Sequence, residues 1–115
     1  MLTSVQEITN SIKNENKPTM IDFYADWCAQ CKELDKYTYT DNEVVSLSKK
    51  LNVIKIDLTK ENNDINNKYS IKGLPVVMFI NRNGEELKEL RITGFMEPKE
   101  FSKKINNLLE SDNKK

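Results

Sequence analysis

Two cysteines separated by two residues stand where a strand-like apolar segment passes into a helical pattern. The segment reads Asp26-Trp27-Cys28-Ala29-Gln30-Cys31 and contains both cysteines of the chain. A cysteine at the N-terminus of a helix is stabilised as a thiolate by the helix dipole and by the free N–H groups of the first turn. The arrangement therefore indicates a redox-active dithiol on a strand-to-helix turn, in which Cys28 attacks a disulfide and Cys31 resolves the mixed disulfide.

Two other uses of cysteine are disfavoured by the residues that accompany the pair. The chain contains no histidine, which excludes the Cys-His pair of a thiol protease and the common Cys/His zinc sets. Two cysteines do not complete a zinc site unless an oligomer combines them. A purely structural disulfide is the other alternative, but it would close a small loop and stabilise the fold little. We therefore expect no cofactor besides a redox-active disulfide between Cys28 and Cys31.

Size and charge limit the remaining possibilities. We expect residues 1–115 to form one domain, because a chain of this length supports a single core. Basic and acidic side chains number 18 each, so no net field draws the chain to nucleic acid or to anionic lipid. No segment has the length of a membrane span or the apolar core of a secretory signal. We expect a monomer that binds proteins, without nucleic acid and without inserting into a membrane.

Hydrophobic periodicity predicts alternating helices and strands in the first part of the chain. Apolar residues at helical spacing predict a helix from Leu2 to Ile12, within a lead-in over residues 1–17. The apolar run Thr19–Ala25 predicts a strand buried on both faces, interrupted only by Asp22. The pattern then predicts a helix over 29–37, a helix from 42 to 51 capped by Asp41, a strand over 53–58 and a weak helix over 62–69.

The last third of the chain predicts a hairpin followed by a helix. Pro75–Ile80 is the most apolar segment, and a turn at Asn81–Gly84 joins it to a second strand over 86–93. Pro98 begins the helix, and the polar residues 110–115 are expected to fray as a tail. Strands separated by helices need crossover connections, whereas a hairpin does not. The order therefore predicts an α/β fold of three layers, with a central mixed sheet between helices.

Several segments of the chain resemble a known family. A buried strand that ends in Trp-Cys-x-x-Cys and a later Gly-Leu-Pro step resemble the thioredoxin superfamily, which implies the thioredoxin fold for nearly the whole chain. More narrowly, three stretches are similar to the C-terminal domain of the DsbD family of thiol:disulfide interchange proteins. These stretches are DFYADWC (22–28), KELDKYTY (32–39) and TGFM (93–96).

The resemblance implies an enzyme, a protein-disulfide reductase that acts through Cys28-Ala29-Gln30-Cys31. Domains of this family receive electrons from a membrane-embedded dithiol and pass them to an acceptor domain in the periplasm. The chain would then be a periplasmic domain of a membrane protein. The alternatives are a stand-alone thioredoxin-like reductase, including a cytoplasmic one, and a peptide-docking module without redox chemistry.

Asp22 lies six residues before Cys28, in the segment expected to be buried. Burial disfavours an ionised carboxyl, so we expect a raised pKa and a role in taking the proton from Cys31. The resemblance also implies an acidic residue beneath the dithiol at this position. The alternative is an aspartate that faces solvent at an exposed end of the strand.

Asp35 follows Cys31 by four residues and would share its helix face one turn on. Its negative charge would then hold the pKa values of the cysteines up. The family carries glutamate here, and the shorter aspartate reaches less far toward the dithiol. An ordinary solvated charge on the helix is the alternative.

Pro75 begins the most apolar segment, where a proline is tolerated because its missing N–H costs little at the first position of a strand. The resemblance implies instead a cis Leu74–Pro75 bond that faces the cysteines and leaves the Leu74 backbone free to pair with a partner segment. Of the nearby aromatic residues, Trp27 is expected on the docking rim or packed under the loop. Tyr37 and Tyr39 are expected in the core or in the groove wall.

The spacer between the cysteines predicts the direction of electron flow. Ala29 and Gln30 are neutral, and no histidine stabilises a Cys28 thiolate strongly. Strong thiolate stabilisation makes a dithiol an oxidant. With two carboxylates nearby, we therefore expect a reductant or electron relay.

Overall fold

A three-stranded mixed sheet forms the middle layer of the computed structural model, which describes residues 2–13 and 16–113. The central strand is β1 (Thr19–Tyr24), flanked by the parallel strand β2 (Asn52–Asp57) and the antiparallel strand β3 (Val76–Ile80). Strands β1 and β3 are buried almost throughout, because helices cover the sheet on both sides. The register places Asp22 on β1 beside Lys55 on β2.

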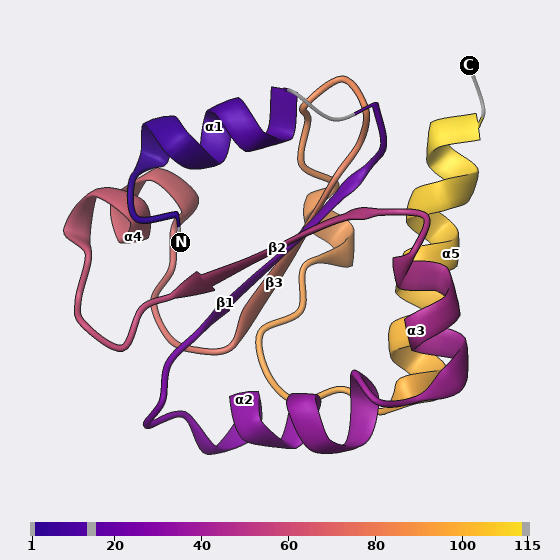
Figure 1. Cartoon of the computed structure of the whole chain (residues 1–115), viewed down its shortest axis with the longest axis horizontal. Helices are drawn as coiled ribbons and strands as arrows, with labels where there is room; N and C mark the ends of the chain where they lie inside the picture. Colours follow the sequence, from indigo (N-terminus) through magenta and orange to yellow (C-terminus); the bar gives the residue numbers. More distant parts are fainter. Residues whose placement is uncertain (1, 14–15, 114–115) are drawn as a thin grey trace.

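Helices α1 (Val5–Lys13) and α4 (Asn63–Tyr69) cover one face of the sheet, and α3 (Asn42–Ser48) and α5 (Pro98–Asn113) cover the other (Figure 1). Side chains alternate along β1, so Ile21 and Phe23 pack into the core beneath α1 and α4, while Met20 packs into the core beneath α3 and α5. Within the described residues, none of these helices has both the length and the apolar character needed to span a membrane. The predicted α/β fold of three layers is confirmed.

Side-chain caps mark the starts of α3 and α4. The Asp41 carboxylate accepts the backbone N–H groups of Glu43 and Val44, each at 3.1 Å, which confirms the predicted cap of α3. The Asn62 side chain accepts the N–H of Ile65 at 3.1 Å and caps α4 in the same way. Both caps satisfy N–H groups that have no partner inside their own helix.

The helix predicted over 29–37 changes its winding part of the way along. It consists of α2 (Ala29–Glu33) and a π-helical segment, η1 (Leu34–Thr38), where the Tyr39 N–H donates to the Leu34 carbonyl at 2.8 Å. A π-helical turn holds more residues than an α-helical turn and re-aims the side chains that follow it. Tyr37 is consequently 53% exposed, whereas Tyr39 packs against the core of the α3 and α5 face.

The predicted second strand of the hairpin is wrong. Only isolated bridges join residues 86–93 to β3, with Leu87 bonded to Phe79 and Ile92 bonded to Val77. Between these two contacts the segment runs from residue 87 to residue 92, whereas the antiparallel strand β3 covers only residues 79 to 77. The surplus residues form a short 3-10 helix, η2 (Lys88–Leu90). This turn lets both Leu87 and Leu90 pack into the same core, which a strand period of two would not allow.

The expected fraying of the C-terminal tail is also wrong for residues 110–113, since α5 continues to Asn113. Asp112 is buried, and its carboxylate accepts the Arg82 backbone N–H at 3.0 Å and pairs with the Arg82 guanidinium. A tertiary contact thus holds a helical turn that is polar in sequence. Residues 114–115 of the predicted tail lie outside the described residues.

Candidate active site

The two cysteines form a disulfide at the turn between β1 and α2. Cys28 caps the helix and Cys31 lies within it, with the Cα atoms 5.3 Å apart. The backbone N–H of Cys31 points at Cys28 Sγ, with a distance of 3.1 Å between nitrogen and sulfur. Such a donor favours negative charge on the sulfur that it faces, which is that of Cys28.

The loop before β3 lies beside the dithiol. The Leu74–Pro75 peptide bond is cis, as predicted, and Pro75 is buried at the start of the strand. The Leu74 side chain packs against the small cluster formed by Ala25, Cys28 and Cys31. The two cysteines are only 5% and 4% exposed, so a partner reaches them across this loop and the dithiol turn.

Thr59 anchors the turn that precedes Cys28. Its hydroxyl accepts the Asp26 N–H at 2.9 Å, and its carbonyl accepts the Trp27 indole N–H at 3.2 Å. The hydroxyl in turn donates to the Asp57 carboxylate at 2.5 Å. Trp27 is 66% exposed and therefore occupies the rim, the first of its two predicted positions. Nothing in the local sequence points to this role of Thr59, because Asp26 and Trp27 lie more than 30 residues away in the chain.

Asp22 is buried, with a side chain 4% exposed, so the solvent-facing alternative is wrong. Burial raises the pKa of its carboxyl to about 6, against the opposing effect of Lys55, whose Nζ lies 3.8 Å from Oδ2. Asp22 Oδ1 and the Tyr39 hydroxyl are buried and lack a hydrogen-bond partner of regular geometry among the described residues. Among the described residues, no hydrogen bond joins the Asp22 carboxyl to a cysteine. Proton transfer from Cys31 to Asp22 therefore stays a prediction.

Lys55 brings the two predicted carboxylates together. Its Nζ lies 3.2 Å from Asp35 Oδ1 as well as 3.8 Å from Asp22 Oδ2. The ammonium also lies over the rings of Tyr24 and Tyr39, 5.1 and 5.4 Å from their centroids. The Asp35 side chain is 53% exposed and acts on Asp22, because its negative charge raises the pKa of that carboxyl further. Its predicted effect on the cysteines themselves stays a prediction.

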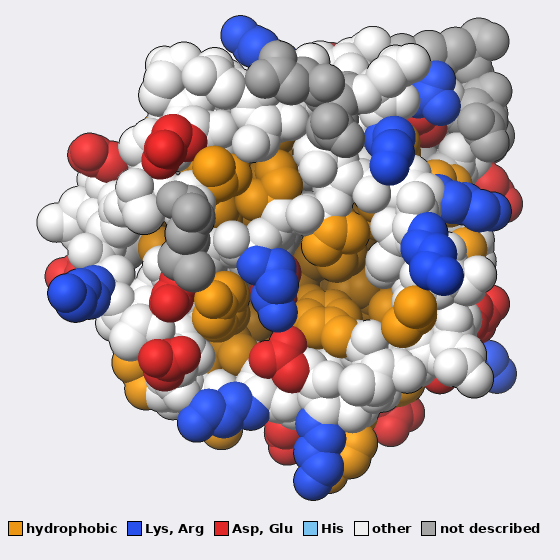
Figure 2. Space-filling model, in the orientation of Figure 1, with side chains coloured by type: hydrophobic (Ala, Val, Ile, Leu, Met, Phe, Trp, Pro, Cys, Tyr) orange, Lys and Arg blue, Asp and Glu red, His pale blue; other side chains and the backbone are white. Residues whose placement is uncertain are grey.

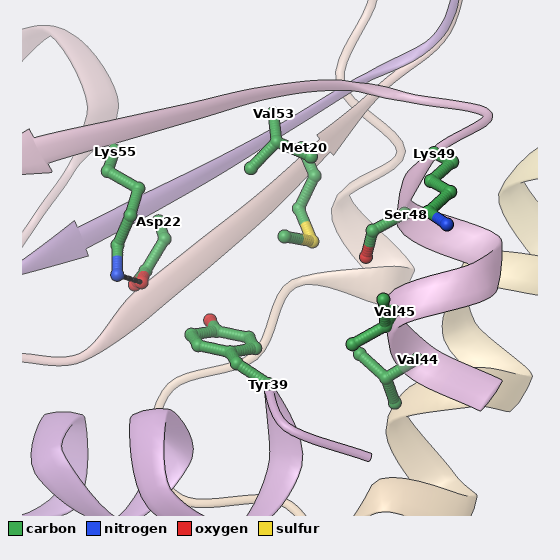
Figure 3. Close-up of a pocket in the computed structure, with 9 residues that line it drawn as sticks. All are labelled: Met20, Asp22, Tyr39, Val44, Val45, Ser48, Lys49, Val53 and Lys55. Carbon is green, nitrogen blue, oxygen red and sulfur yellow. Dashed lines mark ion pairs between the residues drawn. The ribbon is translucent and has the colours of Figure 1, made fainter. Parts of the chain in front are cut away.

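An open cavity of about 320 Å³ connects Asp22 with the surface. Figure 3 shows Asp22, Lys55 and the Tyr39 hydroxyl at one end of this cavity and α3 at the other. Hydrophobic side chains form the floor of a hollow on this face of the molecule (Figure 2). The cavity therefore gives the buried Asp22 carboxyl a route for proton exchange with solvent. The described part of the chain contains no cluster of carboxylates or cysteines that could hold a metal ion. The lining residues are Met20, Asp22, Tyr39, Val44, Val45, Ser48, Lys49, Val53 and Lys55.

Lys55→Gln is expected to raise the pKa of Asp22 above its value of about 6, because the substitution removes the positive charge that opposes burial. The measurement is an NMR titration of the Asp22 carboxyl carbon in both proteins. Lys49→Gln is the matched control, since Lys49 lines the same cavity but is not the ion-pair partner of Asp22. An Asp22 titration curve that shifts equally in both variants would show that the close ion pair has no special effect.

The chain matches known proteins in sequence. The family model for thioredoxin matches residues 1–107. The thiol:disulfide interchange protein DsbD of Haemophilus ducreyi is 38% identical over 111 residues, which are 93% of this chain and 19% of that protein. The DsbD of Actinobacillus pleuropneumoniae is 37% identical over 98 residues, which are 83% of this chain and 17% of that protein. The chain thus spans about a fifth of the length of the curated relatives that it matches.

The fold also matches a solved structure. The oxidised C-terminal domain of DsbD from Neisseria meningitidis superposes with a TM-score of 0.78 at 24% sequence identity. The match covers 94% of this chain and 98% of that domain. At this level of sequence identity, the match shows a shared fold.

Proposed function

Because the chain belongs to the thioredoxin family, we propose that it is a thiol:disulfide oxidoreductase that reduces protein disulfides through Cys28 and Cys31. The observation that carries this proposal is the disulfide at the start of α2, with a cis-proline loop packed against it. Proteins of this family use such a redox-active disulfide rather than a bound cofactor. The geometry leaves one sulfur, Cys28 Sγ, beside a backbone donor.

The proposed reaction begins with the reduced dithiol. The Cys28 thiolate attacks one sulfur of a partner disulfide, and the other partner sulfur leaves as a thiolate. Cys31 then loses its proton and attacks Cys28 Sγ, which releases the second partner sulfur and closes the Cys28–Cys31 disulfide. Two electrons pass from the dithiol to the partner, and the two released thiolates take up protons.

Asp22 is proposed to accept the proton from Cys31 in the second step. A carboxyl with a pKa of about 6 is mostly ionised at neutral pH and is still a better base than an ordinary aspartate. The cavity beside Asp22 supports its return to the ionised state, because the proton can leave toward solvent past Lys55. Pro75 is proposed to shape the docking loop, with the Leu74 backbone available to an extended partner segment.

The similarity to DsbD proteins supports a more specific proposal about direction and place. The chain would relay electrons from a membrane-embedded dithiol to an acceptor domain, as a periplasmic domain of a membrane protein. The neutral spacer of Ala29 and Gln30 agrees with a reducing role, since neither residue stabilises the Cys28 thiolate strongly. A stand-alone protein-disulfide reductase is the second candidate, because the family model for thioredoxin matches residues 1–107 of the chain.

A relay domain is expected to react much faster with its acceptor than with an unrelated disulfide, because complementary docking surfaces raise association rates. We expect the reduced protein to react at least about tenfold faster with the acceptor domain that the resemblance to DsbD implies than with insulin. Stopped-flow tryptophan fluorescence measures both rates. Equal rates would favour the stand-alone reductase, and no reduction of either protein would overturn the proposed function.

A further inference from the structure

We propose that Gln30 is a positioning residue that holds the loop Thr93–Met96 beside the dithiol and thereby controls the docking of protein disulfides, an inference that rests on the proposed function. Gln30 lies between the two cysteines and immediately precedes Cys31. Its side-chain Oε1 accepts the backbone N–H of Phe95 at 2.7 Å. The hydrogen bond therefore connects the dithiol turn to a segment 65 residues further along the chain.

The same loop is attached to the helix after the dithiol at two other points. The hydroxyl of the buried residue Thr38 donates to the Met96 carbonyl at 2.6 Å. The Phe95 ring meets the exposed Tyr37 ring edge-on, with 6.4 Å between the centroids. Thr38 and Tyr37 thus hold Met96 and the Phe95 ring, and Gln30 adds a hydrogen bond to the Phe95 backbone from its position between the two cysteines.

The loop forms part of the surface across which a partner approaches. Thr93 lines a shallow pocket together with Leu74 and Val76, next to the cis peptide bond. Leu74 in turn packs against Cys28 and Cys31. Three segments thus lie next to one another, namely the dithiol turn, the cis-proline loop and the loop Thr93–Met96. A side chain that links the first segment to the third sets the width of the groove between them.

Gly94 provides the space that the Gln30 side chain occupies. A Cβ atom at this position would lie 3.0 Å from Gln30 Oε1 and within 4 Å of no other atom outside its immediate neighbours. The backbone of Gly94 lies outside the left-handed region, so an alanine there is not strained by its own conformation. Alanine at this position would therefore push Gln30 Oε1 away by a few tenths of an ångström and weaken its hydrogen bond to the Phe95 N–H.

The test compares a protein disulfide with a small disulfide that needs no groove. The probes are the faster of the two protein substrates above and 5,5′-dithiobis(2-nitrobenzoate). We expect Gln30→Ala to lower the second-order rate with the protein roughly threefold to tenfold, the usual effect of one lost hydrogen bond, through KM rather than kcat. The rate with the small disulfide should fall by less than the rate with the protein, because alanine keeps the spacer neutral and the small disulfide needs no groove.

A double-mutant cycle makes the test specific for the Gln30 contact. Gly94→Ala should act in the same direction as Gln30→Ala with a smaller effect, and the double variant should be no slower than Gln30→Ala alone. Gln30→Glu keeps an acceptor oxygen, so it should preserve the ratio of the two rates even if its charge slows both. Gln6→Ala, on the exposed face of α1, is the matched control.

Two results would overturn this inference. One is an unchanged ratio of protein to small-disulfide rates in Gln30→Ala, and the other is that the effects of the two substitutions multiply in the double variant. Failure of the proposed function looks different, because the wild-type protein would then not reduce the protein disulfide, whereas any accessible thiol reacts with the small one. Thermal unfolding of each variant, followed by circular dichroism, shows whether a lost rate reflects lost fold.

Discussion

Cys28→Ser is expected to abolish the reduction of both protein and small disulfides. A serine hydroxyl is essentially un-ionised at neutral pH, whereas the Cys28 thiolate is stabilised by the Cys31 N–H at 3.1 Å. The rate should fall by at least about a thousandfold, to the background of the assay, since no other thiolate occupies the attacking position. Single-turnover absorbance measurements with 5,5′-dithiobis(2-nitrobenzoate) and insulin turbidity provide the two readouts.

The control for this experiment is Asn10→Ser, which introduces the same side chain on the exposed face of α1. This control should retain the wild-type rate. If Cys28→Ser retained full function in cells, the thioredoxin scaffold would serve as a peptide-docking module, and the redox function would be wrong. The cis-proline loop and the exposed Trp27 would then serve only in binding a partner.

Asp22→Asn is expected to stabilise the protein at neutral pH and to slow its chemistry. Burial raises the pKa of Asp22 from 3.8 to about 6, so the folded chain keeps a proton that the unfolded chain releases near pH 4. The free energy of unfolding therefore falls as the pH rises between these values, and the full cost in stability is present above about pH 6. A shift of this size corresponds to about 3 kcal/mol, at 1.36 kcal/mol for each pKa unit.

Asparagine cannot ionise, so the substitution should remove this cost above about pH 6 and change little below pH 4. Urea unfolding at pH 3.5 and at pH 7.5 measures the difference in free energy of unfolding. Glu110→Gln removes an exposed charge from α5 and serves as the matched control. An Asp22→Asn protein with the same stability gain at both pH values would show that the carboxyl is not destabilised by burial.

The same substitution tests the proton transfer. In the wild-type protein, the resolving step should become faster as the pH rises through about 6, because the ionised Asp22 carboxylate accepts the proton of Cys31. In Asp22→Asn this inflection should disappear and the step should slow. A buried carboxylate that costs stability but speeds exchange is a typical compromise at a functional site.

The parts of the fold that follow from local sequence were predictable. The buried strand around Asp22, the Asp41 cap and the dithiol turn each depend on residues close together in the chain. The cis bond at Pro75 followed from the family resemblance. These features depend on motifs and short-range periodicity, which a single sequence displays.

The features that escaped prediction depend on contacts between distant segments. Lys55 acts on Asp22 because parallel strands place the two residues side by side, and that register is not visible before the strands are paired. The last turn of α5 persists because Asp112 binds Arg82. The hydrogen bond from the Phe95 N–H to Gln30 spans 65 residues, and neither residue type signals it.

The most direct test of the central claim is to trap the mixed disulfide and determine which cysteine carries it. Cys31→Ser removes the resolving thiol, so the reduced variant mixed with oxidised insulin should accumulate a covalent adduct through Cys28. Intact-mass and peptide mass spectrometry identify the bonded residue, and Cys28→Ser should give no adduct. An adduct on Cys31 in Cys28→Ser, with none in Cys31→Ser, would contradict the assignment of Cys28 as the attacking sulfur.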